Sequence, residues 1–318
     1  MQSSRPPEST TRAPGAPGPK EDRSAIVLLT VPFIWGATFP AGKQALDVLT
    51  PLSFTAWSRA LGFAVLIAAL PLLGRDLPRD WVARTAAPGL ILGGLLFAGF
   101  TLQTLGLDLS TATNAGFITG LYVVFTPVLG VVLFKEGTSS AAWVAVFVSV
   151  AGLALLSTTS LRSFQPRPGD LLVLLSAFAW AGHVVALGRF AVRFPARGLA
   201  IAQMGAAALF HVVAAAPFGL QLRDAVSVWP MLTITGVFGS GVAFTLQAMA
   251  QEEIGPTRAA VSWAGESLVA AVLSALWINE RLAPHQWAGA ALVLGAMILS
   301  ELKARSRAEP YLEPGSAA

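Results

Sequence analysis

Apolar residues fall into long runs along this chain, and short polar connections separate each run from the next. A helix of about 20 apolar residues, rising about 1.5 Å per residue, matches the hydrocarbon core of a bilayer. Ten such runs predict helices at residues 25–43, 51–73, 86–106, 111–134, 140–157, 169–189, 197–217, 228–249, 256–278 and 284–302. The pattern therefore predicts an all-α integral membrane protein with ten transmembrane helices.

Composition supports a membrane protein, because 54% of the residues are hydrophobic and 12% are charged. A soluble domain has about 25% charged residues, and one soluble core could not bury this much apolar surface. The absence of cysteine excludes disulfides, thiolate metal sites and cysteine nucleophiles. Neither a metal nor a cofactor is expected. Residues 1–24, rich in proline and charge, and residues 303–318 are predicted to be polar tails, the first disordered.

The chain also contains an internal repeat. The sequence Phe-Thr-Leu-Gln occurs at 100–103 and again at 244–247, an offset of 144 residues. The further matches are Glu136 with Glu280 and Trp143 with Trp287 at the same offset, and Trp35 with Trp180 at 145. These matches predict a first five-helix repeat at 25–157 and a second at 158–302.

Five helices per repeat is an odd number, so the second half must enter the membrane inverted. Two inverted five-helix repeats are typical of secondary transporters, which bind their substrates near the bilayer midplane between the halves.

Lys and Arg residues predict the orientation in the membrane. With the N-terminus inside, fifteen of them lie on the inner side, five lie outside, and Arg59 lies within a helix. This bias predicts that both termini lie in the cytoplasm. The inner or plasma membrane is the expected location. Segments 140–157 and 284–302 are the least polar, so we expect them at the periphery.

Glu266 is the main candidate for a functional residue, because it is an acid near the middle of the run 256–278. A carboxylate at that depth costs at least about 2.5 kcal/mol on insertion scales, so it is expected to face the bundle interior. Apolar surroundings disfavour its charged form, which makes Glu266 the candidate for proton coupling. Ser262 and Trp263 precede it by four and three residues, on the same face of one continuous helix.

Several other residues are candidates for lining the same cavity. The predicted set is Glu266, Gln103, Gln247, Trp35, Trp180, Ser262, Trp263, Arg59, Tyr122, Asn114 and His183. Structural roles remain open for some of them. The two glutamines can join helices by hydrogen bonds, Arg59 can extend to the interface, and His183 can be a core histidine.

Short motifs in order along the chain resemble those of a known family. They are Trp35-Gly36-Ala37-Thr38-Phe39 with Lys43, Arg59 in FTAWSRALGF, Gly169-Asp170 followed by Trp180, Glu266-Ser267, and Asn279-Glu280-Arg281-Leu282. Over about residues 25–302 the chain resembles the drug/metabolite transporter superfamily and, within it, the EamA-type transporters. Ser267 stands where that family has proline. In the first half, Thr126-Pro127 keeps the proline but lacks the acid. Glu136 follows Thr126 by ten residues, four fewer than separate Glu280 from Glu266 in the second half.

The resemblance implies ten helices, cytoplasmic termini and movement of small metabolites, often export. We therefore expect a secondary transporter of amino-acid-like or other small organic solutes that works by alternating access. The expected partners are a small-molecule substrate and the lipid bilayer, and a homodimer is a further option.

No catalytic motif supports an enzyme, and the scattered basic residues argue against nucleic-acid binding. Two alternatives are left open: a membrane enzyme acting on a lipid-linked substrate and, more weakly, a membrane-embedded scaffold.

Overall fold

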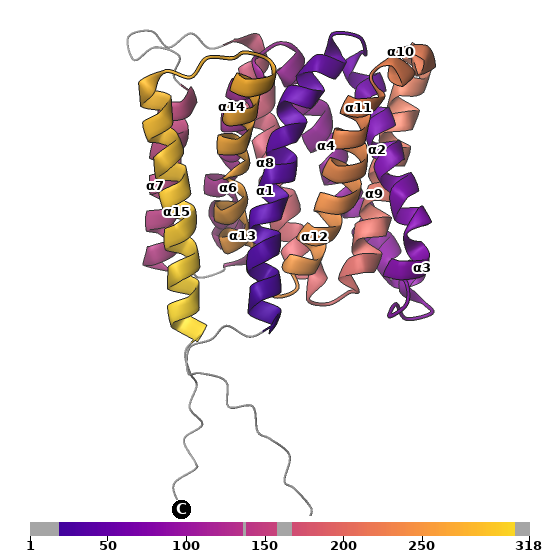
Figure 1. Ribbon diagram of the computed structural model, residues 1–318. Helices are drawn as coiled ribbons and strands as arrows, with labels where there is room; N and C mark the ends of the chain where they lie inside the picture. Colours follow the sequence, from indigo (N-terminus) through magenta and orange to yellow (C-terminus); the bar gives the residue numbers. More distant parts are fainter. Residues whose placement is uncertain (1–18, 136–137, 158–166, 309–318) are drawn as a thin grey trace, which may run out of the picture.

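The computed structural model describes residues 19–135, 138–157 and 167–308, and these residues form a bundle of helices (Figure 1). The helices are α1 Pro19–Leu46, α2 Pro51–Ala68, α3 Leu70–Leu73, α4 Trp81–Asp108, α5 Ala112–Gly120, α6 Tyr122–Phe134, α7 Ser140–Ser157, α8 Pro168–Ala191, α9 Ala196–Ala215, η1 Ala216–Phe218, α10 Leu222–Ser227, α11 Trp229–Leu232, η2 Thr233–Val242, α12 Ala243–Ala250, α13 Pro256–Trp263, α14 Glu266–Trp277 and α15 Pro284–Ala308. The described part of the chain contains no strand.

Seven helical segments of the described chain are long and apolar enough to cross a membrane. They are Pro51–Ala68, Trp81–Asp108, Ala112–Phe134, Pro168–Ala191, Ala196–Phe218, Trp229–Ala250 and Pro256–Trp277. A shorter apolar helix covers Ser140–Leu155. These segments make the chain an integral membrane protein, while the count of ten spans stays a prediction.

Hydrogen bonds at one end of the bundle establish the directions of the helices. Lys43, near the end of α1, donates from Nζ to the carbonyls of Leu107 and Asp108 at the end of α4, both at 2.9 Å. Ser110 donates from Oγ to Asp170 Oδ1 in the first turn of α8, at 2.6 Å. The end of α1 and the beginning of α8 therefore lie together, so these repeat-equivalent helices run in opposite directions.

We call this end of the bundle the upper end, as it is drawn in Figure 1. Helix α1 begins and helix α15 ends at the opposite, lower end. The described ends of the chain thus lie on the same side of the bundle.

The contacts between helices repeat in both halves. Helix α4 contacts α8 and α9, and its counterpart η2 contacts α1 and α2. Helix α2 packs on its own counterpart α9, and α7 packs on α15. The α7–α15 pair stands at one edge of the bundle (Figure 1), the peripheral position predicted for these two segments.

Two glycines on α4 allow it to pack closely against α9. A Cβ atom placed on Gly89 would lie 2.5 Å from the Cβ of Ala202, and one on Gly93 would lie 2.4 Å from the Cβ of Ala206. Both distances are far shorter than any van der Waals contact. Glycine is required at these positions because the helix backbones approach so closely.

The segment 256–278 is a candidate membrane span, as predicted, but a tight turn divides it into two helices. Helix α13 ends at Trp263 and α14 begins at Glu266. Ser262 and Trp263 therefore do not share an unbroken helical face with Glu266. At the break, the Ser267 N–H donates to the Ala264 carbonyl at 3.2 Å, the spacing of a tighter 3₁₀ turn. Gly265, a poor helix former, lies in this turn.

The segment 111–134 is broken in the same way. Helix α5 ends at Gly120 and α6 begins at Tyr122, and the Val124 N–H donates to the Leu121 carbonyl at 3.0 Å. Leu121 and Gly265 are 144 residues apart, the offset of the repeat. Both halves therefore contain one discontinuous helix, and such helices line polar cavities in membrane proteins.

The first and last helices of the chain are longer than predicted. Helix α1 begins at Pro19 rather than at residue 25, and α15 continues to Ala308 rather than ending at 302. Hydropathy marks only the part of a helix that lies in lipid, whereas Lys, Glu and Arg continue a helix well in water. The rest of the predicted tails, residues 1–18 and 309–318, and also Glu136, lie outside the described residues.

Glu280 holds the upper end of the bundle together across the two halves. Its Oε1 accepts from the Ala112 N–H and its Oε2 from the Thr113 N–H, both at 3.1 Å. The Thr113 hydroxyl also donates to Oε2. The carboxylate thus satisfies the free N–H groups at the start of α5, where a negative charge is also favourable.

Replacement of Glu280 by alanine is expected to destabilise the protein by about 1–2 kcal/mol, the usual cost of a lost helix cap. The measurement is the midpoint of thermal unfolding of the purified protein in detergent. Glu280→Gln, which keeps one oxygen acceptor, should lose less. Equal midpoints for the wild type and Glu280→Ala would contradict the capping role.

Candidate functional site

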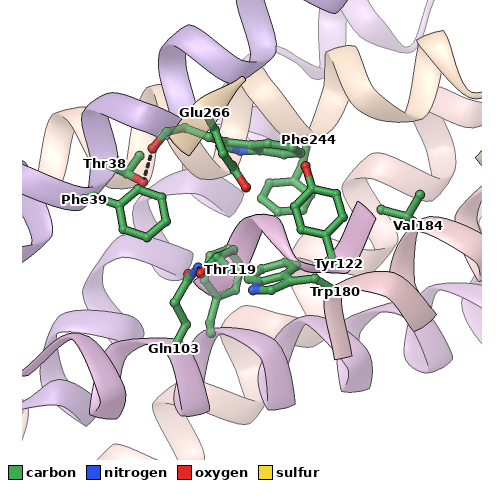
Figure 2. A pocket seen from close by; sticks show the side chains of 11 residues that line it. Thr38, Phe39, Gln103, Thr119, Tyr122, Trp180, Val184, Phe244 and Glu266 are labelled. Carbon is green, nitrogen blue, oxygen red and sulfur yellow. Dashed lines mark hydrogen bonds between the residues drawn. The ribbon is translucent and has the colours of Figure 1, made fainter. Parts of the chain in front are cut away.

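A cavity lies between the two halves of the bundle and has an empty volume of about 410 Å³ (Figure 2). Its lining comes from seven helices: α1, α4, α5, α6, α8, α12 and α14. The lining residues are Trp35, Thr38, Phe39, Phe100, Gln103, Thr119, Tyr122, Trp180, Val184, Phe244 and Glu266. We call it the central cavity.

Residues that are equivalent in the repeat line the central cavity in pairs. The offset of 145 residues relates Trp35 to Trp180 and Phe39 to Val184, and the offset of 144 relates Phe100 to Phe244 and Tyr122 to Glu266. Tyr122 and Glu266 each begin the helix that follows a break. The cavity therefore lies where the symmetry of the repeat brings the two halves together.

Aromatic rings form most of the cavity wall. Trp35 packs on Phe244 with ring centroids 5.1 Å apart, and the equivalent rings Trp180 and Phe100 are 4.7 Å apart. Phe100 and Phe244 contact each other at 5.6 Å. A mostly apolar wall with few polar groups is characteristic of sites for small organic molecules.

Two polar groups from different halves face each other within this wall. Glu266 is 4% exposed and Tyr122 is 3% exposed. Both side chains line the central cavity, and the Tyr122 hydroxyl has no hydrogen-bond partner among the described residues. On the other side of the cavity, Gln103 donates from Nε2 to the Thr119 hydroxyl at 2.9 Å. Figure 2 shows the Glu266 and Gln103 side chains pointing into the same space.

A second cavity, with an empty volume of about 430 Å³, adjoins the first. We call it the upper cavity, because Phe54 and Leu107 in its wall lie at the upper ends of α2 and α4. Its lining is Trp35, Thr38, Phe39, Phe54, Arg59, Phe100, Gln103, Thr104, Leu107, Thr235 and Gly239. Five of these residues also line the central cavity, so the two spaces share a wall.

The region of the second half that is equivalent in the repeat to the upper cavity is packed. Gln247, the counterpart of Gln103, is 1% exposed, whereas Gln103 is half-buried. His183, the counterpart of Thr38, is 0% exposed, and its Nε2 lies 2.8 Å from Oε1 of Gln203. Gln251 donates from Nε2 to the Val184 carbonyl at 2.8 Å. The two halves therefore share their sequence pattern but differ in packing around the cavity.

The candidate residues fall into three groups. Trp35, Trp180, Gln103, Tyr122 and Glu266 line the central cavity, and Arg59 lines the upper cavity. The remaining candidates, Gln247, Ser262, Trp263, Asn114 and His183, are buried but line neither cavity. The predicted place of these five residues in the cavity wall is therefore not what the structure shows.

Sequence reasoning missed six residues of the central cavity: Thr38, Phe39, Phe100, Thr119, Val184 and Phe244. Phe100 and Phe244 open the repeated Phe-Thr-Leu-Gln sequence and could have been found from it. The same offset applied to Glu266 would also have marked Tyr122 as its counterpart.

A membrane-spanning helical bundle with two oppositely directed halves around a central cavity is typical of membrane transporters. The chain belongs to the EamA-like transporter family, whose model matches it twice, at residues 23–158 and 167–302.

Similar proteins agree with this assignment. An "Uncharacterized transporter" of Archaeoglobus fulgidus is 31% identical over 91% of this chain and 89% of its own length. The "Uncharacterized transporter YyaM" of Bacillus subtilis is 24% identical over 85% of this chain and 90% of its own. A solved crystal structure shares the fold with a TM-score of 0.73 at 22% identity, covering 91% of this chain and 99% of that one.

Proposed function

We propose that this chain is a secondary transporter that exports small organic solutes, amino-acid-like ones among them, by alternating access. Its two five-helix halves exchange roles in opening the central cavity to one side of the membrane and then to the other. Both termini lie in the cytoplasm, so the upper end faces outward. The observation that carries the proposal is the difference in packing between equivalent residues around the cavity.

In this conformation the upper end holds a cavity beside α1 and α4, whereas the repeat-equivalent region near the lower end is filled. Because the halves are related by an inverted repeat, exchange of their conformations would close the upper space and open the lower one.

Single cysteines in the cysteine-free chain test this exchange. A cysteine at Gln103 is expected to react with a membrane-impermeant thiol reagent from the outside, because Gln103 lines the open side. A cysteine at Gln247 is expected to react only from the cytoplasmic side, in the opposite state. Reaction of both cysteines from the same side would contradict alternating access.

The substrate and the direction of transport require a separate measurement. Untargeted metabolite analysis of medium and cells, with and without the protein, should show a solute that accumulates in the medium when the protein is present. A variant with unchanged lipid-facing surface, Glu266→Gln, is the matched control for expression. Accumulation of the solute inside the cells would establish import instead.

A further inference from the structure

Arg59 is a buried cation that no carboxylate of the described residues neutralises. Its side chain is 3% exposed, and it lies in the membrane-spanning helix α2. Its Nη2 donates to the Thr235 carbonyl at 3.3 Å, and its Cζ lies 3.5 Å from the centroid of the Phe100 ring. Its Nε has no hydrogen-bond partner. A charge removed from water needs a counter-charge, because its desolvation is costly.

The protein contacts hold the guanidinium in place without cancelling its charge. Thr235 belongs to η2, a π-helix of ten residues, and its carbonyl also accepts from the Ser240 hydroxyl at 2.8 Å. Gly239 of the same π-helix accepts from Trp35 Nε1 at 3.1 Å. The π-helix therefore fixes both Arg59 and Trp35 at the cavity wall, and π-helical segments of this kind occur often at functional sites.

The free side of Arg59 is turned to the upper cavity. Arg59 lines this cavity together with Gln103, Thr104 and Trp35. A carboxylate bound in the upper cavity would therefore meet the guanidinium among its lining groups. The planar fork of arginine donors matches the two oxygens of a carboxylate.

The repeat places this charge in one half only. The residue 144 positions after Arg59 is Gln203, whose Oε1 is engaged with His183. The repeat-equivalent site therefore offers a neutral amide instead of a cation. This difference gives the cavity a direction, with the cation near the upper end and the Glu266–Tyr122 pair in the central cavity.

We propose that Arg59 binds the carboxylate of the transported solute, so that the substrate is a small organic carboxylate with an aromatic or flat apolar body. The body lies against Trp35 and Phe100, which the two cavities share. The inference rests on the proposed transport function and names the substrate class for the same site.

The experiment uses the full-length chain with one introduced cysteine, Gln103→Cys, in right-side-out membrane vesicles. Two thiol reagents are compared, the anionic sulfonatoethyl and the cationic trimethylammonioethyl methanethiosulfonates. With Arg59 present, the anionic reagent should react roughly tenfold faster than the cationic one, relative to their rates with a free thiol. Phenylacetate should slow the reaction, whereas phenethylamine, with the same ring and a positive charge, should not.

Three further variants sharpen the result. Arg59→Gln introduces the residue that the second half already has, and should abolish both the preference for the anionic reagent and the protection by phenylacetate. Arg59→Lys keeps the charge and should retain part of both. Arg189→Gln, the matched control, removes an arginine that also lies over a ring, 3.9 Å from the centroid of Phe134, but lines neither cavity. It should behave like the wild type.

The proposal is overturned if phenylacetate fails to protect the wild-type site at millimolar concentration, or if Arg59→Gln leaves the protection unchanged. Protection by phenethylamine alone overturns it as well and indicates a cationic substrate. Phenylalanine, tested in the same way, separates carboxylates in general from zwitterions. Sidedness of labelling at positions 103 and 247 is read in parallel, so a failure of carboxylate binding is distinguishable from a failure of alternating access.

Discussion

Glu266→Gln is expected to abolish uphill transport and its dependence on pH, while exchange of solute at equal pH on both sides continues. The amide keeps the size and hydrogen bonding of the acid but cannot take up or release a proton. The expected loss is complete for uphill transport, because Glu266 is the only carboxyl group among the residues lining the two cavities and an amide cannot carry its proton.

The position of Glu266 supplies the physical reason. It begins α14 after a helix break, it is almost fully buried, and Phe244 and Trp35 are among the residues beside it in the cavity wall. Apolar surroundings favour the neutral acid, whereas water in an open cavity favours the carboxylate. Only such a difference in affinity between the two states can let protons bias the conformational equilibrium.

The measurement is uptake of the identified solute into proteoliposomes, with and without an imposed pH gradient. Glu252→Gln is the matched control, since Glu252 lies in the turn between α12 and α13 and lines neither cavity. Uphill transport by Glu266→Gln with an unchanged pH profile would refute the proton role. If the variant no longer binds the solute, Glu266 is a substrate-binding carboxylate instead.

Gly93→Leu is expected to prevent stable folding, because a side chain at this position must enter the backbone of α9. Even the first added atom would lie 2.4 Å from the Cβ of Ala206 and 3.0 Å from the backbone nitrogen of Ala207. Neither neighbour can move away without separating the two helices. Overpacking costs about 1–3 kcal/mol where a core can adjust, and we expect a larger loss here.

The neighbouring glycine provides the control. A Cβ on Gly94 meets nothing within 4 Å, although it lies one residue further along the same helix. Gly94→Leu should therefore fold and unfold at nearly the wild-type temperature in detergent. Similar losses for both variants would mean that helix propensity or insertion, rather than the α4–α9 contact, limits stability.

The membrane class, the repeat and the buried position of Glu266 between helices could all be predicted from the sequence. Apolar runs of bilayer length are a one-dimensional property, and the offset between Phe100 and Phe244 can be read directly. A single acid inside such a run is costly wherever it faces lipid, so its burial between helices could be expected.

The helix breaks before Tyr122 and Glu266 depended on tertiary structure. A hydropathy pattern does not distinguish one long apolar helix from two short ones, because both satisfy the same requirement for apolar side chains. The break is stable only where neighbouring helices surround the freed backbone groups. The sequence predicted one helix at each of these places for that reason.

Which buried residues face the cavity was also decided by packing alone. Lipid chains are as apolar as leucine, so side chains toward lipid and toward other helices look alike in the sequence. Gln103 and Gln247 occupy equivalent positions, yet the first lines an open cavity and the second is enclosed. The sequence determined a bundle of membrane helices with an internal repeat and with polar residues inside its apolar segments. The tertiary structure decided which of these polar residues line the two cavities.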